Sequence, residues 1–343
     1  MSKTGSGFGL ALIAVVALLS AGCSTRSKPS VASNGPTMAS SGTATPTITP
    51  SPARTAATAV AQQTPVVNGG RLVVLADGQN GVRGIWSLGP DFHWALQGST
   101  PTATAIGRTA SGLALATDAG VEVRKGSELS KPGSLTTIRW AGAEPTAPIV
   151  GVDYSSADKA AFVMEDDSTL GYAVAGIGGT VATLTPAPTQ SFSPLVAWLD
   201  ENRLLVLSTD NRQVSRLAVI DVAARTMTPA GALAGVRVFA ASVDGKTVAA
   251  ATEGAVYVAP FDAFTGSRSP EQIVTLADRQ VVWGLALDRT GSSLFLLSGS
   301  IGESGSIGDV HELGYTRQGL SWQKALDSAV PFGRAVGQVY LAS

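Results

Sequence analysis

The sequence predicts an all-β protein whose folded part is a β-propeller. Beyond residue 68, apolar runs of four to seven residues alternate with Gly, Asp, Asn and Ser, and no run reaches helix length. Frequent short strands separated by turn residues indicate a sandwich, a barrel or a propeller. The runs recur every 42 to 47 residues. About 45 residues with four short strands is the size of one propeller blade, so the period favours a propeller.

Six apolar runs mark the second strand of each predicted blade. The tight-turn residues at their starts are Gly70, Gly112, Lys159, Asn202, Gly245 and Gly291. An apolar strand closed by an acid precedes several of these turns, as in VFAASVDGK and LALDRTGSS. A further turn and strand follow the runs, as in GAVYVAP. Each repeat therefore supplies four strands, with the acid-closed strand innermost.

The two ends of the repeat region predict how the ring closes. Gly70 opens a second strand with no inner strand ahead of it, and the chain ends in the unpaired run AVGQVYLA. We expect this C-terminal run to be the inner strand of a blade whose outer three strands come from residues 71–99, since closure removes exposed strand edges. The prediction is six blades. Seven is the alternative, if residues 64–68 or the long last repeat contain another unit.

The blade sequences resemble those of known propellers. VDGKTVAAATEGAVYV, at residues 243–258, is similar to blades of WD40-like and TolB-like propellers. WLDENRLLVLSTD, at residues 198–210, resembles the propeller part of the LpqB-type lipoproteins of actinobacteria, although nothing here matches their extra domain. The resemblance implies a fold rather than a function, because propellers host many unrelated functions.

Residues 1–22 are predicted to be a lipoprotein signal peptide. The apolar run FGLALIAVVALLSA has about 14 residues, fewer than the roughly 20 that span a bilayer, as in a secretory signal. It ends in LSAGC, which resembles the lipobox of bacterial lipoproteins, with Ser20 where that family most often has Leu. The resemblance implies cleavage between Gly22 and Cys23 and lipidation of Cys23.

Residues 23–68 are predicted to be a lipidated cysteine followed by a disordered tether, and residues 69–343 the propeller domain. Ser, Thr, Pro and Ala fill 30 of the 45 positions after Cys23. These residue types build no apolar face, so the segment cannot offset its ordering entropy. Low-complexity Ser/Thr/Pro segments also carry O-linked sugars in some proteins. The sequence is compatible with either a bare tether or a glycosylated one.

Composition excludes several classes of partner and cofactor. The formal net charge is -1, with 14% charged residues, whereas nucleic-acid binding needs a basic surface. One cysteine leaves no intramolecular disulfide and too few thiolates for a structural zinc site. We expect no nucleic-acid partner, no cofactor and a monomeric domain.

No catalytic motif is present. The two histidines are His93 and His311, and neither lies near a G-x-S-x-G elbow. The Gly-rich segment SGSIGESGSIGD, at residues 298–309, matches neither nucleotide-binding pattern and is predicted to be an inter-strand loop. The sequence therefore favours a non-enzymatic protein. The alternatives are a propeller hydrolase or lactonase with a metal in the central channel, and a small-ligand binding protein.

Acidic residues follow the second strand of every predicted blade, on the face where we expect ligands to bind. These residues, the acidic rim, are Asp77, Asp118, Asp166 with Asp167, Asp210, Glu253, and Glu303 or Asp309. Acids are common in tight turns because their side chains bond the nearby backbone. Their summed field could instead attract a cation or a basic partner. Asp244 and Asp288 are predicted to lie on the opposite face, as structural turn residues.

Together these features predict an exported propeller held by a lipid on the extracytoplasmic face of a bacterial cell membrane. There it would act as an interaction or sensing module with an envelope protein as its partner. The sequence does not identify that partner.

Overall fold

The computed structural model describes residues 71–343 except 79, 90–92, 118, 142–146, 167–168, 176–179, 191–193, 267–268, 302–306, 319–320, 336–339 and 343. The predicted signal peptide and tether, including Gly22 and Cys23, lie outside the described residues. The described chain is almost entirely β. Its helices are a 3-10 turn at Gly126–Glu128 and α1 at Phe261–Phe264. In this part of the chain, no helix has the length and hydropathy needed to span a membrane.

The strands form six antiparallel blades. Blade 1 contains β25 (Phe332–Ala335) and β26 (Tyr340–Ala342), then β1 (Arg71–Gly78), β2 (Arg83–Leu88) and β3 (Trp94–Ser99). Blade 2 contains β4 (Ala103–Thr109), β5 (Gly112–Thr117), β6 (Gly120–Lys125) and β7 (Ser134–Thr136). Blade 3 contains β9 (Ile149–Tyr154), β10 (Ala160–Asp166), β11 (Thr169–Ala175) and β12 (Thr180–Gln190), with β8 (Arg139–Trp140) parallel to β12.

The second half of the domain repeats this order. Blade 4 contains β13 (Val196–Trp198), β14 (Arg203–Thr209), β15 (Ser215–Asp221) and β16 (Thr226–Ala234). Blade 5 contains β17 (Val238–Ala241), β18 (Thr247–Ala251), β19 (Ala255–Pro260) and β20 (Glu271–Thr275). Blade 6 contains β21 (Gln280–Leu287), β22 (Ser293–Ile301), β23 (Ile307–Gln318) and β24 (Ser321–Ala329).

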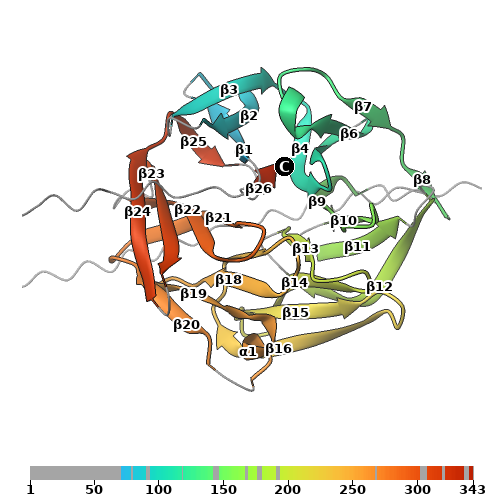
Figure 1. The fold of residues 1–343 in the computed structure, drawn as a ribbon. Coiled ribbons are helices and arrows are strands. Elements are labelled where there is room, and N and C mark those ends of the chain that lie inside the picture. The colour runs from blue at the N-terminus through green and yellow to red at the C-terminus, as the bar shows by residue number, and fades with distance from the viewer. Residues whose placement is uncertain are drawn as a thin grey trace, which may run out of the picture. The chain divides into compact units, whose positions relative to one another are not determined.

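The first strands of the blades form the inside of a ring. Contacts run from β26 to β4, β9, β13, β17, β21 and back to β26, and Figure 1 shows the blades around this centre. The C-terminal strands β25 and β26 both pair with β1, which belongs to the N-terminal end of the domain. The predicted six blades and the predicted shared blade are both confirmed.

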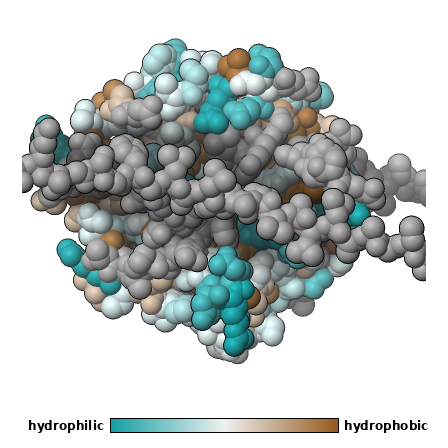
Figure 2. Space-filling model, turned by 180° about the vertical axis from the view of Figure 1, so that it is seen from behind, coloured by the Kyte–Doolittle hydropathy of each residue, from teal (hydrophilic) through white to brown (hydrophobic). Residues whose placement is uncertain are grey.

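The hydrophobic core lies between neighbouring blades. Successive side chains of a strand point to opposite faces, so Val73 and Leu75 of β1 pack with blade 2, whereas Leu72 and Val74 pack with blade 6. Both faces of the second strands are therefore buried. This explains why those strands are continuously apolar in the sequence and why the domain has so few charges. On the described surface in Figure 2, hydrophobic side chains are scattered among hydrophilic ones.

The closing strands are held in blade 1 by aromatic packing. The ring of Phe332 in β25 lies 5.1 Å from that of Trp94, in an edge-to-face arrangement, and 5.4 Å from that of Trp86. Both Phe332 and Tyr340 of β26 are buried. Such aromatic pairs add stabilisation beyond the area they bury. The C-terminus is therefore an integral part of the ring.

Glycines allow the blades to approach closely at two places near the ring centre. A Cβ on Gly107 of β4 would lie 2.0 Å from the carbonyl oxygen of Val152 in β9. A Cβ on Gly245, in the turn after β17, would lie 1.6 Å from the carbonyl oxygen of Leu199. Gly245 also has a φ of +67°, which favours glycine.

Replacing Gly245 with alanine is expected to lower the free energy of unfolding by at least 2 kcal/mol, on the order of an overpacked core site plus left-handed strain. Gly254→Ala is the matched control, since a Cβ there meets nothing within 4 Å and no positive φ restricts it. Urea denaturation followed by tryptophan fluorescence measures both. Equal stability of the two variants would contradict the close approach of blades 4 and 5.

Candidate functional site

A pocket opens at the centre of one face of the ring. This face, the first-turn face, carries the turns that join the first and second strands of the blades. The pocket has a volume of about 420 Å³, within the usual range for binding sites. Its lining comes from blades 2 to 6 and comprises Arg108, Thr109, Ala110, Tyr154, Ser155, Ser156, Trp198, Leu199, Asp200, Glu201, Val243, Asp244 and Arg289.

A buried cluster around Arg108 forms the floor of this pocket. The Arg108 guanidinium donates to the carbonyl oxygens of Ala241 at 3.0 Å and Trp198 at 3.1 Å. Its Nε lies 3.3 Å from Oδ1 of Asp153. The other carboxylate oxygen of Asp153 accepts the backbone N–H of Trp198 at 3.0 Å. Because these residues belong to β4, β9, β13 and β17, one side chain connects blades 2 to 5.

Burial controls the protonation of this cluster. Complete burial raises the pKa of the Asp153 carboxyl, although the Arg108 charge and backbone N–H donors act in the opposite direction. Burial also raises the pKa of the Tyr340 hydroxyl, and the negative charge of Asp153 raises it further. Tyr340 comes from the closing strand of blade 1. The floor of the pocket is therefore a buried polar cluster that ties the inner strands together.

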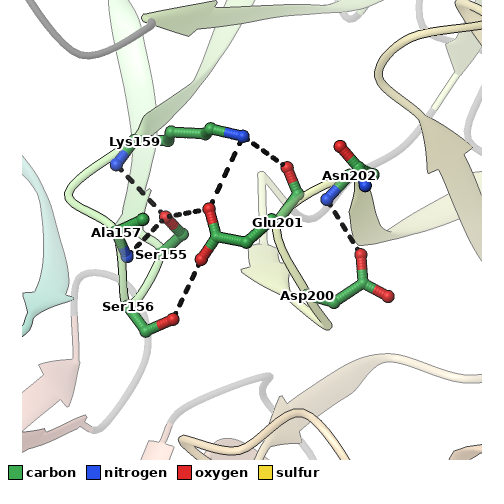
Figure 3. A network of polar contacts seen from close by, with 7 residues as sticks. All are labelled: Ser155, Ser156, Ala157, Lys159, Asp200, Glu201 and Asn202. Carbon is green, nitrogen blue, oxygen red and sulfur yellow. Dashed lines mark hydrogen bonds and ion pairs between the residues drawn. The ribbon is translucent and has the colours of Figure 1, made fainter.

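A second polar network joins two turns at the pocket edge, as Figure 3 shows. Glu201, in the turn after β13, accepts a hydrogen bond from Ser156 at 2.9 Å and one from Ser155 at 3.5 Å. Lys159 Nζ donates to the Glu201 carbonyl oxygen at 2.9 Å and lies 3.5 Å from its carboxylate. The serines and the lysine belong to the turn after β9. Glu201 therefore fixes the turn of blade 4 against that of blade 3.

Glu201→Ala is expected to lower the free energy of unfolding by about 1 kcal/mol, because it removes hydrogen bonds and a partly exposed ion pair. Glu128→Ala is the control, since Glu128 ends the 3-10 turn and pairs with Lys131, an exposed residue three positions further on. We expect that control to leave the stability close to that of the unaltered chain. Urea denaturation compares the two, and an equal loss would show that Glu201 does not couple the blades.

Three described residues of the predicted acidic rim lie on the opposite face. Asp77, Asp210 and Glu253 follow or end second strands, so the topology places them at the other end of the blades from the pocket. Asp77 pairs with Arg83 at 3.0 Å, and Glu253 pairs with Arg237. Backbone N–H groups, first that of Val214, lower the pKa of Asp210. Each of these three carboxylates therefore has a local partner.

The remaining residues of the acidic rim are described only in part. Asp118, Asp167 and Glu303 lie outside the described residues. Asp166 belongs to β10, and its side chain is outside the described part. Asp309 was predicted in a loop but belongs to β23, because β22 and β23 extend through much of the predicted loop. The sequence missed this hairpin because Gly and Ser in the segment 298–309 are typical of loops.

The two histidines belong to different blades. His93 is exposed just before β3, and His311 lies in β23 opposite Ser298. The described residues contain no group of three or more His, Cys, Asp or Glu side chains placed to hold a metal.

Two residues of the buried cluster are recognisable in the sequence, although the strand pattern did not mark them as part of a site. Arg108 and Asp153 are single charges in otherwise apolar inner strands, ATAIGRT and IVGVDY. Asp244 was predicted as a structural turn residue, and it does accept hydrogen bonds from Ser242 and the Lys246 backbone. It also lines the pocket. A single charged residue in an inner strand was therefore a better sequence marker of the pocket than the acidic rim.

Solved structures share this architecture. A candidate TolB from Agrobacterium tumefaciens matches with a TM-score of 0.51 and 13% identity, over 79% of this chain and 94% of that chain. TolB from Acinetobacter baumannii matches with a TM-score of 0.56 and 10% identity, over 81% and 68%. A candidate 6-phosphogluconolactonase from Bacteroides fragilis is more distant, with a TM-score of 0.41 and 10% identity, over 79% and 98%. No protein-family model and no curated protein matches the sequence.

The chain contains a six-bladed β-propeller, a fold similar to that of the two TolB structures. At these sequence identities the likeness concerns the fold, so the function has to be argued from the pocket and from the N-terminal sequence.

Proposed function

We propose that this protein is an exported, lipid-anchored and non-catalytic interaction module of a bacterial cell envelope, whose protein partner docks on the first-turn face. The observation that carries the proposal is the central pocket, framed by turns from five blades. Val243, at its edge, is an aliphatic side chain with 38% exposure. A partner that docks there would bury this apolar side chain, which is favourable.

The pocket floor supports binding rather than turnover. Every nitrogen of the Arg108 guanidinium faces an acceptor in the protein. Asp153 is fully buried and is held by Arg108 and a backbone N–H. Groups held in this way make a rigid base, and rigid pockets lower the entropic cost of binding.

The docking proposal is tested by replacing Val243 with arginine in the full chain and comparing the proteins that co-purify with it. We expect loss of a specific partner. Leu135→Arg is the matched control, because Leu135 is 54% exposed on the outer strand β7, away from the pocket. A partner retained by Val243→Arg, or lost equally with Leu135→Arg, argues against docking on this face.

The anchor proposal rests on the LSAGC sequence at residues 19–23. Cys23→Ser removes the thiol that would carry the lipid, so the protein should move from the membrane fraction to the soluble fraction and lose labelling by a palmitate analogue. Ser33→Ala, within the predicted tether, is the control. Membrane retention of Cys23→Ser would refute the lipid anchor.

A further inference from the structure

We infer that the pocket on the first-turn face binds a carboxylate of the partner, held by Arg289. This inference rests on the proposed docking of a partner on that face, and it specifies the chemistry that the pocket recognises. It is unexpected from formal charge, because the lining contains three acids, Asp200, Glu201 and Asp244, and two arginines, Arg108 and Arg289.

The three acids of the lining already accept hydrogen bonds from residues of the surrounding turns. Asp200 accepts from the Asn202 backbone at 2.9 Å and from Arg203 Nε at 2.6 Å. Partial burial raises the pKa of Asp200, but these two donors outweigh it, and the pKa lies below its ordinary value. Such a carboxylate has little capacity left for a ligand cation.

The other two acids are bonded in the same way. Glu201 is occupied by the serines and the lysine of blade 3, as Figure 3 shows. Asp244 Oδ1 accepts from Ser242 Oγ at 2.6 Å and from the Lys246 backbone at 3.1 Å. A basic ligand would therefore have to compete with existing hydrogen bonds at each of these carboxylates.

The two arginines of the lining differ in whether their guanidinium groups already have partners in the protein. The guanidinium of Arg108 is buried, pairs with Asp153 and donates to two carbonyl oxygens. Arg289 is exposed, follows β21 and makes no hydrogen bond or ion pair with the described residues. Of the charged side chains that line the pocket, Arg289 is therefore the one without a bonding partner among the described residues. A guanidinium with free donors binds a carboxylate through two parallel hydrogen bonds.

Tyr154 supplies a second free donor on the other side of the pocket. Its hydroxyl makes no hydrogen bond with the described residues. Burial raises its pKa, and the charge of Asp158 raises it further, so the hydroxyl keeps its proton and donates. Arg289 belongs to blade 6 and Tyr154 to blade 3, which lie three blades apart in a ring of six. A segment that spans the pocket would place its carboxylate at Arg289 and a carbonyl oxygen near Tyr154, beside the apolar Val243.

The test measures binding of four short peptides to the full chain in detergent by saturation-transfer NMR. Acetyl-Leu-Glu-amide presents a side-chain carboxylate, and acetyl-Leu-Leu presents a C-terminal one. Acetyl-Leu-Gln-amide and acetyl-Leu-Lys-amide are the neutral and cationic analogues. We expect binding of one or both carboxylate peptides, and the one that binds more tightly identifies the source of the carboxylate. Loss of Arg289 should weaken that binding about tenfold or more.

Matched variants separate this effect from a general change in charge. Arg289→Leu should lose binding, whereas Arg212→Leu, an exposed turn arginine on the opposite face, should retain it. The inference is overturned if the lysine or glutamine peptide binds as tightly as the carboxylate peptides, if no peptide binds, or if Arg289→Leu changes nothing.

The outcomes also distinguish this inference from the docking proposal. A partner that is lost with Val243→Arg while carboxylate peptides fail to bind would leave docking intact and refute the carboxylate. Peptide binding that depends on Arg289, without any partner that depends on Val243, would support the carboxylate site and refute docking of a protein there.

Discussion

Arg108→Met is expected to lower the free energy of unfolding by about 3–5 kcal/mol, the cost of leaving one member of a buried ion pair without the other. Asp153 is completely buried, and Arg108 is its charged partner at 3.3 Å. The substitution also removes hydrogen bonds to the carbonyl oxygens of Trp198 and Ala241. Urea denaturation of the full chain, followed by tryptophan fluorescence, measures the loss, since all six tryptophans lie in the propeller domain.

Adding Asp153→Asn to Arg108→Met should restore part of this stability, because the asparagine side chain carries no charge and its oxygen still accepts the Trp198 N–H.

The stability of the single Arg108→Met variant should also depend on pH. Burial already raises the Asp153 pKa in the folded state, and loss of Arg108 removes a group that lowers it. The folded chain then binds this proton more tightly than the unfolded chain. The stability gap between the single and double variants should therefore narrow as the pH falls from 7 to 5. A gap that is constant or widens would contradict the buried ion pair.

Ending the chain at Ala329 is expected to abolish the stable ring. The truncation removes β25 and β26 and exposes the edge of β1. It also removes Phe332 from its site between Trp86 and Trp94. We expect the truncated chain to be digested by protease under conditions in which the full chain is intact, and a synthetic peptide of residues 330–343 to restore protection.

A milder variant keeps this prediction testable if the truncated chain does not accumulate. Phe332→Ala should lower the free energy of unfolding by about 3–5 kcal/mol, as for other buried aromatic residues. Leu135→Ala, at an exposed position, should change it by less than about 0.5 kcal/mol. If Phe332→Ala were as stable as the control, the C-terminal strands would not be essential to closure.

The sequence predicts the ring because the local signals agree with one another. Second strands such as LVVLA in β1 are apolar on both faces, since each face packs on a different blade. The turns that separate these strands contain Gly, Asp or Asn, and their spacing is that of a blade. Even the shared blade follows from the unpaired run at the C-terminus, because a ring leaves no strand without a neighbour.

The pocket could not be predicted in the same way. Its residues lie in five different blades, so only the closed ring brings Arg108, Asp153 and Arg289 to one place. The acids that are most regular in sequence, such as Asp77 and Asp210, lie on the other face and are occupied by local donors. A charged side chain is available to a ligand only if it is not already hydrogen-bonded within the protein, and the sequence does not show those hydrogen bonds.

If the partner docks on the first-turn face, crosslinking in living cells should capture it there. A photo-reactive amino acid is placed at Val243, beside the pocket, or at Arg212, in the turn between β14 and β15 on the opposite face. We expect a discrete protein adduct from position 243 that position 212 does not give. An adduct from position 212 alone would contradict it and would direct attention to the acidic rim.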